Sequence, residues 1–420
     1  MVQIILVASF LFQTPAALDS PSPKERSAAI EKMAVIGNRA AIPVLAAALK
    51  KEPKSDIRAE MVGALGRIRD REAVPVLADT MKSDLDKDVR SQAIDSMLRL
   101  YIPIEEAGGP IRTIFSKVKS VFLQPNAPVV SPEVQVDTAA KEALAVTMQK
   151  DFDDDVRNQA LRALASLNAR DQVPALLTAL EDPLNREHRT VRVEIVRTLG
   201  VLRDPSSGPA LERALRDTDT QLVAEAVLAV GLTGHSSARP VLEEMFRTHP
   251  SALVKGRALE SLALLHDRES TPLFESLLTN TNDNYRELAA EGLARSGYTG
   301  AKDWRTRFDE EKKPNVRNAL AYGLAASGDM DYVNNLANAL DSRQSSQAEV
   351  YLYELGKFDG KLPELYRYLK SMNPRVRAGV TRVIGRIGDP SSADQIRPLT
   401  DDPNTEVVRE AVAALRKLAK

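Results

Sequence analysis

A short phrase returns along the chain at nearly constant intervals, and this repetition constrains the fold more than any other feature. The phrase is an acid, then Val-Arg, then Ala four residues after the Val, as in "DKDVRSQAIDSML" from Asp86 and "DDDVRNQALRAL" from Asp153. Most spacings are 31 or 32 residues, and such a period predicts a stacked array of units rather than a globule. Aligned on the Val, the copies lie at Ile57, Val89, Val156, Val191, Val254, Tyr285, Val316, Val376 and Val408, with weaker copies near Val223 and Ala348.

Each unit is predicted to consist of two helices. The first begins near a Pro that opens a segment such as "VPVLADTM", because the first turn of a helix does not need the missing N–H. The second begins at the acid before Val-Arg, whose carboxylate can accept hydrogen bonds from free backbone N–H groups. Eleven pairs are predicted from about residue 41 onward, after one amphipathic helix over residues 24–36. The glycines expected to end helices include Gly66, Gly200, Gly328 and Gly388.

Neither helix of a pair can bury its apolar side alone, so neighbouring pairs must stack. The fold class predicted is therefore all-α, an α-α superhelix. The markers "P-x-L" and "D-x-V-R-x-x-A-x-x-x-L-G" resemble the HEAT repeat, especially the short bacterial form called the phycobilisome-lyase-like HEAT repeat. The resemblance covers nearly all of the chain after residue 23 and implies a HEAT-repeat solenoid whose second helices line the concave side.

The resemblance also implies a kind of function, because most members of the family are scaffolds and partner-binding proteins. We expect a non-catalytic scaffold, a monomer, that presents its concave surface to a protein partner. The alternative is a HEAT-like lyase subunit, or another enzyme, that uses the solenoid as a cradle for its substrate.

Composition argues against several other functions. Lys and Arg total 57 against 58 Asp and Glu, a balance that does not suit a nucleic-acid-binding protein. The chain has no Cys, which excludes disulfides and thiolate metal sites. Deoxyhypusine hydroxylase, whose architecture is similar, needs His-Glu pairs to hold two irons, and none of the four His residues here is followed by Glu. We therefore expect no catalytic residue, no metal and no cofactor.

The chain is expected to divide into four parts. Residues 1–17 suit a secretory signal peptide, because the apolar run over residues 4–12 is too short to span a bilayer and small residues follow it. This predicts an exported protein, periplasmic or secreted; if the run were instead a buried first helix, the protein would be cytoplasmic. N-terminal repeats over 22–100, an insert over 101–137 and C-terminal repeats over 138–420 follow.

The insert interrupts the repeats with a basic amphipathic segment. Its apolar residues recur at helical spacing, and from residue 108 to 132 it holds three cations and no acid. It could dock on a partner groove or on an anionic membrane surface, but three cations are few for membrane binding, so we favour a cover over the repeat stack. The candidate surface-docking residues are Ile111, Arg112, Phe115, Lys117, Lys119 and Phe122.

Aromatic side chains gather in one part of the chain, where the repeat markers also fade. Ten of the nineteen aromatic residues lie between Tyr298 and Tyr368. Spacing places Tyr351 on a buried stripe with Leu352, Leu355 and Phe358, while other aromatics fall on different faces. Exposed Tyr beside Arg is typical of protein-binding surfaces, although large core residues at a change of curvature would give the same composition. The candidate partner-binding residues are Trp304, Tyr332, Tyr353 and Tyr368.

The cation of the phrase places one positive charge per unit at an equivalent position. A ladder of such cations could form an anion-binding groove. The structural interpretation, which we prefer, is that each Arg pairs with an acid of its own or the adjacent unit, such as Asp56, Asp88 or Asp155. The ladder is Arg58, Arg90, Arg157, Arg192, Lys255, Arg286, Arg317, Arg377 and Arg409.

Overall fold

The computed structural model describes residues 17–36, 38–102, 130, 134–298, 303–357 and 359–419. All of the predicted signal peptide except Ala17 lies outside these residues. The six candidate docking residues of the insert, Ile111, Arg112, Phe115, Lys117, Lys119 and Phe122, also lie outside them. Cleavage and surface docking therefore stay predictions.

Two compact units divide the chain, residues 1–229 and residues 230–420. In the first unit α2 (Pro23–Ile36) precedes the pairs. The first helices are α3 (Ala41–Leu49), α5 (Val74–Ser83), α8 (Thr138–Lys150), α10 (Val173–Glu181) and α12 (Gly208–Ala214). The second helices are α4 (Ser55–Ile68), α6 (Lys87–Arg99), α9 (Asp154–Ser166), α11 (Arg189–Leu202) and α13 (Thr220–Thr233), the last of which continues into the second unit.

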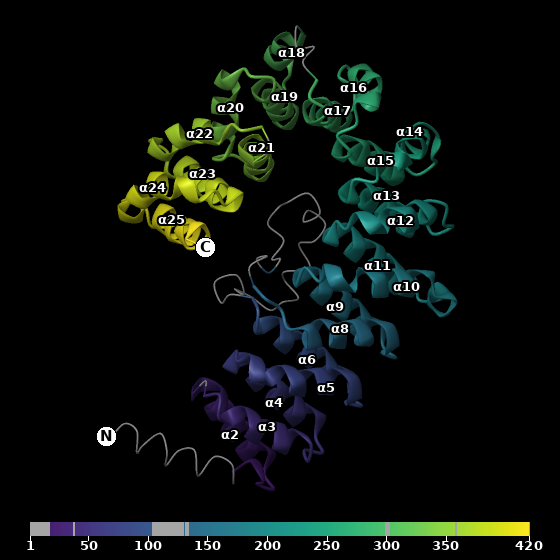
Figure 1. The fold of residues 1–420 in the computed structure, drawn as a ribbon, viewed down its shortest axis with the longest axis vertical. Helices are drawn as coiled ribbons and strands as arrows, with labels where there is room; N and C mark the ends of the chain where they lie inside the picture. The colour runs from purple at the N-terminus through teal and green to yellow at the C-terminus, as the bar shows by residue number, and fades with distance from the viewer. Residues whose placement is uncertain are drawn as a thin grey trace. The chain divides into compact units, whose positions relative to one another are not determined.

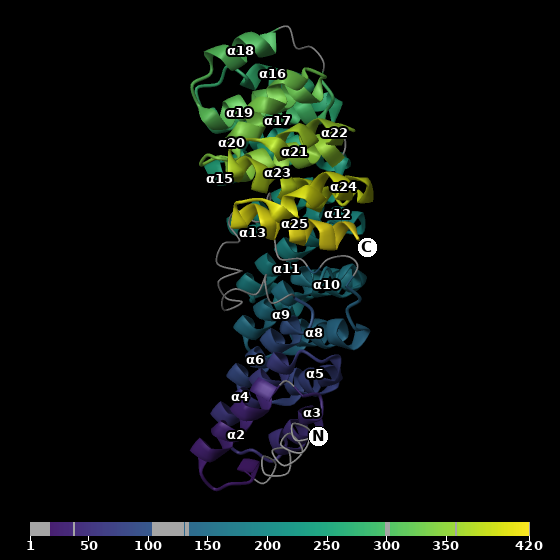
Figure 2. The ribbon, with the colours of Figure 1, turned by 90° about the vertical axis from the view of Figure 1, so that its left-hand side faces the viewer.

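The second unit repeats the pattern. Its first helices are α14 (Arg239–Thr248), α16 (Thr271–Leu277), α18 (Trp304–Glu310), α20 (Val333–Ala339), α22 (Leu362–Leu365) and α24 (Ala393–Ile396). Its second helices are α15 (Ala252–Leu264), α17 (Asp283–Arg295), α19 (Pro314–Ala326), α21 (Ser345–Lys357), α23 (Pro374–Ile387) and α25 (Thr405–Leu418). The described residues thus form the eleven predicted pairs and no strand. Within each unit the second helices lie side by side in one row and the first helices in another (Figure 1 and Figure 2).

Within each unit, second helices pack on neighbouring second helices, which confirms the solenoid fold. In the first unit α4 lies between α2 and α6, and α9 between α6 and α11; in the second, α17 lies between α15 and α19, and α23 between α21 and α25. The helices before and after the insert stack directly, α6 on α9 and α5 on α8. Over the described part of the chain, no helix combines the length and the apolar character needed to cross a membrane.

Several second helices begin at a side-chain cap as predicted, whereas α4, α11, α15 and α19 begin without one. Asp86 caps α6 by accepting from the backbone N–H of Asp88 at 2.9 Å, and Asp153 caps α9 in the same way. The residue three positions after the cap is buried, as Val89 and Val376 show. This register corrects two of the alignments, because the residues three positions after the caps Asp219 and Asn404 are Leu222 and Val407, both buried, rather than Val223 and Val408.

Helix ends follow one position rather than one residue type. Twelve residues after the aligned position, nine units place a left-handed residue: Arg69, Asn168, Arg203, Gly234, His266, Gly297, Gly328, Gly360 and Gly388. Gly328 and Gly388 therefore end helices as expected. The prediction is wrong for Gly66 and Gly200, which lie inside α4 and α11. Gly66 is required for close packing instead, since a Cβ there would lie 2.7 Å from the Cβ of Ser96.

Candidate functional site

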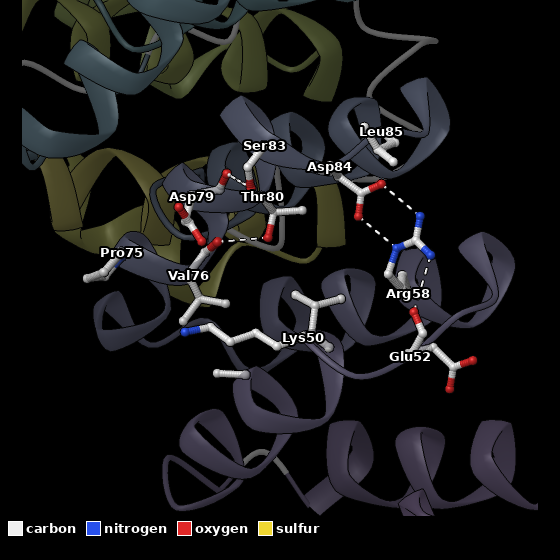
Figure 3. A pocket seen from close by; sticks show the side chains of 12 residues that line it. Lys50, Glu52, Arg58, Pro75, Val76, Asp79, Thr80, Ser83, Asp84 and Leu85 are labelled. Atoms are coloured by element: carbon white, nitrogen blue, oxygen red, sulfur yellow. Dashed lines mark hydrogen bonds and ion pairs between the residues drawn. The ribbon is translucent and has the colours of Figure 1, made fainter.

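The Arg of the phrase joins each unit to the next. Arg58 donates from Nε and Nη2 to the two carboxylate oxygens of Asp84, at 2.8 and 2.9 Å, and from Nη1 to the carbonyls of Glu52 and Pro53 (Figure 3). Asp84 also accepts from the backbone N–H of Asp86, at the start of the next second helix. The guanidinium of one unit, the acid of the next unit and the start of that unit's second helix are therefore joined, and we call this arrangement a staple. The same staple recurs in Arg26–Glu52, Arg90–Asp151, Arg286–Glu311 and Arg377–Asp402, and Arg192 contacts Asp217.

These contacts confirm ion pairing with the adjacent unit and correct the partners. The acid is the residue that follows the first helix of the next unit, not Asp56, Asp88 or Asp155. Arg157 uses the amide oxygen of Asn185 instead, at 2.5 Å. Lys255 donates to the carbonyl of Arg247 in the last turn of α14, and Arg317 donates to the carbonyl of Glu311. Arg409 lies one residue beyond the ladder position.

Two second helices carry no cation at the ladder position. The position holds Val223 in α13. In α21 it holds Glu349, and the corresponding loop residue is Ser371 rather than an acid. Where a cation is present without an acid, as at Arg157 and Arg317, it donates to an amide or carbonyl oxygen instead. These local partners indicate that the ladder serves folding.

Two hollows lie beside these staples at equivalent places. One, of about 570 Å³, is lined by Arg58, Asp84 and the exposed side of α5 (Figure 3). The other, of about 350 Å³, is lined by Arg286 and Glu311 in the second unit. Because the bonded Arg-acid pair lines both, we interpret the hollows as gaps between neighbouring first helices. The hydrogen bonds of Arg58 to Asp84 and to two carbonyls leave little capacity for an anion, which does not favour the groove hypothesis.

A different cluster lies on the second helices of the second unit, where α21 reaches past α19 to α17. Gln347 donates from Nε2 to Glu287 Oε1 at 2.6 Å, and the Tyr351 hydroxyl donates to Glu291 Oε1 at 2.5 Å. Asn315 of α19 donates to the other oxygen of Glu287. Two acids one turn apart on α17 are therefore held by side chains from two later units. We call Glu287, Glu291, Gln347 and Tyr351 the acid cluster.

Arg295 completes the cluster at the end of α17. Its guanidinium donates to both oxygens of Glu354 at 3.0 Å and to Glu291 at 3.0 Å. The Tyr322 hydroxyl donates to the same Glu354 at 2.7 Å. The ring of Tyr322 stacks on that of Tyr351, with centroids 4.8 Å apart and planes 5° apart. The stack therefore joins the two rings whose hydroxyls bind Glu354 and Glu291.

Burial and neighbouring charges shift the pKa values of the acids in this region in opposite directions. Burial, and then the charge of Glu291, raises the pKa of Glu287 to about 7. Burial also raises the pKa of Glu260 on the neighbouring α15. Burial alone would raise the pKa of Glu354 too, but Arg295 and Tyr322 outweigh it and lower that pKa. At neutral pH the Glu287 carboxyl is thus present in both forms, while the lowered pKa keeps Glu354 ionised.

The cluster offers proton-transfer chemistry rather than a metal site. Among the residues described, no group of three or more His, Cys, Asp or Glu side chains is arranged to hold a metal ion. Glu287 can give or accept a proton near pH 7, and hydrogen bonds from α19 and α21 fix its orientation.

Of the four candidate partner-binding aromatics, the structure buries two and leaves two half-buried. Trp304 is 2% exposed and lies in the core, against Gly323, and Tyr368 is also buried, so the expectation that these rings lie on the surface is wrong. Tyr332 is half-buried and packs edge-on against Phe308. Tyr353 is half-buried with Arg386 over its ring, at 4.8 Å from the centroid. Partner binding by Tyr332 and Tyr353 stays a prediction.

Sequence reasoning placed Tyr351 on a buried stripe with Leu352 and Leu355, which the structure confirms; Phe358 lies outside the described residues. It missed the acid cluster. The available signal was Glu287 and Glu291 on one helix face, with polar Gln347 and Tyr351 four residues apart two units later. Gln347 and Tyr351 contact Glu287 and Glu291 because α21 extends past α19 to α17, and a repeat pattern does not predict such a contact.

Comparison with known proteins defines the family. The HEAT repeats pattern matches residues 14–97, 183–263 and 348–416, more than half of the chain, and the PBS lyase HEAT-like repeat matches residues 156–182. The chain therefore belongs to the HEAT-repeat family, as the sequence markers predicted.

Named relatives were found as well. Phycocyanobilin lyase subunit alpha of Nostoc sp. is 30% identical over 189 residues, which cover 40% of this chain and 66% of that protein. Deoxyhypusine hydroxylase of Arabidopsis thaliana is 24% identical over 224 residues, 52% of this chain and 69% of that protein. A solved structure of importin beta is 12% identical with a TM-score of 0.43, covering 96% of this chain and 67% of that chain.

These relatives correct one expectation. The sequence-based prediction of a protein that is not an enzyme is wrong, because the relatives that match are a lyase subunit and a hydroxylase. The prediction rested on the lack of a familiar catalytic motif, and a motif search cannot detect a site assembled from three successive repeats.

Proposed function

We propose that this protein is an enzyme subunit of the lyase type, which holds a protein partner against the second helices of its second unit. The observation that carries the proposal is the acid cluster, in which Gln347 and Tyr351 of α21 fix two carboxyls of α17. The lyase subunit among the relatives supports the reaction class.

Glu287 is the group that we assign to proton transfer. Lyases form or remove a bond by addition or elimination, and each direction needs a proton given or taken. A carboxyl with a pKa of about 7 is present in both forms at neutral pH, which suits either step. Burial, and then the negative charge of Glu291, which Arg295 and Tyr351 bind, keep that pKa raised.

The test compares the wild-type chain with Glu287→Gln, which keeps the shape of the side chain and removes the titrating group. Phycocyanobilin, the substrate in the relative's name, is the first compound to supply, together with a protein that co-purifies with the chain. Attachment or release of the bilin is followed by absorbance after gel filtration. We expect the variant to keep its partner and to turn over about a hundredfold more slowly or worse, the usual effect of losing a general acid or base.

Glu244→Gln, an exposed acid of the first helix α14, is the matched control and should leave turnover unchanged. Full turnover by Glu287→Gln would remove this residue from the mechanism. Absence of any bilin reaction with wild-type protein would exclude this substrate class. Substitution of Tyr332 or Tyr353 by Ala then tests partner contact separately, by the amount of partner retained.

We propose further that the chain is exported, on the strength of the apolar segment at residues 4–12 and the small residues after it. N-terminal sequencing of the mature protein from its native source tests this. A mature N-terminus close to residue 17 is expected, and an intact Met1 or Val2 would contradict export by a cleaved signal.

A further inference from the structure

Three consecutive loops of the first unit carry a large apolar side chain at the tip. Leu85 is 97% exposed between α5 and α6, Phe152 is 100% exposed between α8 and α9, and Leu184 is 80% exposed between α10 and α11. Leu85 and Phe152 each stand directly after the acid that pairs with the preceding unit's Arg.

Bonds between the loops show that the tips lie along one edge. Lys87 of the first loop pairs with Asp153 of the second at 3.1 Å. Asp154 of the second is joined to His188, after the third, with 2.8 Å between Oδ1 and Nδ1. Since α6, α9 and α11 also stack in sequence, the three loops are successive neighbours on the same side of the unit.

The fold does not require apolar residues at these tips. The corresponding position elsewhere holds polar or small residues such as Thr218, Thr281 and Lys312. A side chain that is almost fully exposed gains nothing from burial within the chain. In the second unit a large apolar residue appears once at this position, as Met372. The three tips of the first unit are therefore available to something outside the chain.

The surroundings of the tips are acidic. Residues 84–88, 151–155 and 181–187 together contain ten acidic and two basic residues. Arg58 and Arg90 neutralise Asp84 and Asp151, but Asp88 and Asp155 are exposed. Such an edge repels an anionic membrane surface and attracts a basic partner.

We propose that Leu85, Phe152 and Leu184 form a docking edge for a cationic amphipathic helix of a protein partner. Stacked helices repeat at about 10 Å, and two turns of an α-helix rise about 11 Å. A helix lying along the edge with an apolar residue at every seventh position therefore meets one tip per repeat. Lysines or arginines between those residues face the acids of the loops.

A synthetic helical peptide with Leu at every seventh position and Lys at the flanking positions is the probe, and its binding to the full chain is measured by fluorescence anisotropy. Phe152→Ser should weaken binding at least about tenfold, because burial of one large apolar side chain changes an equilibrium by that factor or more. Met372→Ser, equally exposed at 96% but in the second unit, should leave affinity unchanged. A peptide with Glu in place of Lys should not bind.

Several results would overturn the proposal. These are no binding of the Lys peptide, equal loss from Phe152→Ser and Met372→Ser, or equal binding of the Glu peptide. Light scattering that shows a dimer dissociated by Phe152→Ser would assign the edge to a second copy of the chain. Binding to anionic vesicles that Phe152→Ser abolishes would assign it to a membrane. Because the altered side chains are exposed, thermal melting of the variants should match wild type.

Discussion

Gln347 of α21 donates a hydrogen bond of 2.6 Å to Glu287 of α17, sixty residues earlier in the chain and two repeats away. Tyr351 of the same helix reaches Glu291 in the same manner. HEAT units ordinarily contact their immediate neighbours, so these bonds connect units that a nearest-neighbour stack would keep apart. The stability of this part of the second unit should therefore depend on the charge of the Glu287 carboxyl.

That dependence predicts an effect of pH on stability. The pKa of Glu287 is raised from 4.5 to about 7 on folding, so the folded chain binds this proton more tightly than the unfolded chain. The stabilisation is complete below pH 4.5 and is lost as pH rises to about 7, with a fall of at most about 3 kcal/mol in the free energy of unfolding. Denaturant titrations across this range should show the fall in wild type and in Glu244→Gln, and Glu287→Gln should reduce it.

Glu354 should behave in the opposite way. Its pKa is lowered, so its contribution is present above the unfolded value of 4.5 and is lost as pH falls through the lower folded value. Glu354→Gln removes one acid from the buried Arg295 and should destabilise the chain by about 3 kcal/mol at pH 7. Chemical denaturation measures the loss. An unchanged midpoint would contradict the role given to the Arg295–Glu354 pair.

The ladder predicts a large effect from one arginine and none from another. Arg377→Met leaves the buried Asp402 without its partner, and removal of one member of such a pair costs about 3–5 kcal/mol. Arg409→Met is the matched control, because Arg409 is exposed and outside the ladder. Addition of Asp402→Leu to Arg377→Met should recover part of the stability. Thermal unfolding of the four proteins decides, and equal melting of the two single variants would refute the staple.

Two glycines in second helices of the second unit should respond with opposite signs. A Cβ at Gly323 would lie 1.5 Å from the Trp304 ring, so Gly323→Ala should destabilise by about 3 kcal/mol through overpacking. Gly256 in α15 has no neighbouring atom within 4 Å of such a Cβ. Gly256→Ala should therefore stabilise by about 0.5–1 kcal/mol, the gain in helix propensity. Calorimetry of the two variants gives both values.

The repeat pattern predicted the described fold well because its signals are local. Asp86 and Val89 define a cap and a core position within one turn, and the core position recurs even where the cap is absent, as at Ile57 of α4. The same logic failed at Gly66 and Gly200, since a glycine ends a helix in one place and permits close packing in another. Sequence alone does not say whether Ser96 lies against it.

The candidate site could not be predicted in this way, because it depends on burial and on contacts between repeats. Trp304 and Tyr368 are aromatic residues in a region of weak repeats, and composition does not distinguish a filled core from a binding surface. Glu287 is a glutamate in the middle of a helix, and nothing in the sequence around it marks it as a functional residue. Its raised pKa comes from burial and from the charge of Glu291, which outweigh the hydrogen bonds from Asn315 and Gln347; these groups meet only when three repeats are stacked.

The arrangement of the staples has a consequence for how such a chain can change over time. Two repeats, α3–α4 and α5–α6, contribute both an arginine toward the following loop and an acid toward the preceding one. Copying or deleting either of them whole leaves no orphaned charge. A repeat that supplies only one partner, such as α16–α17 with Arg286, does not share this freedom. Gains and losses of repeats in related genes should therefore concentrate at α3–α6.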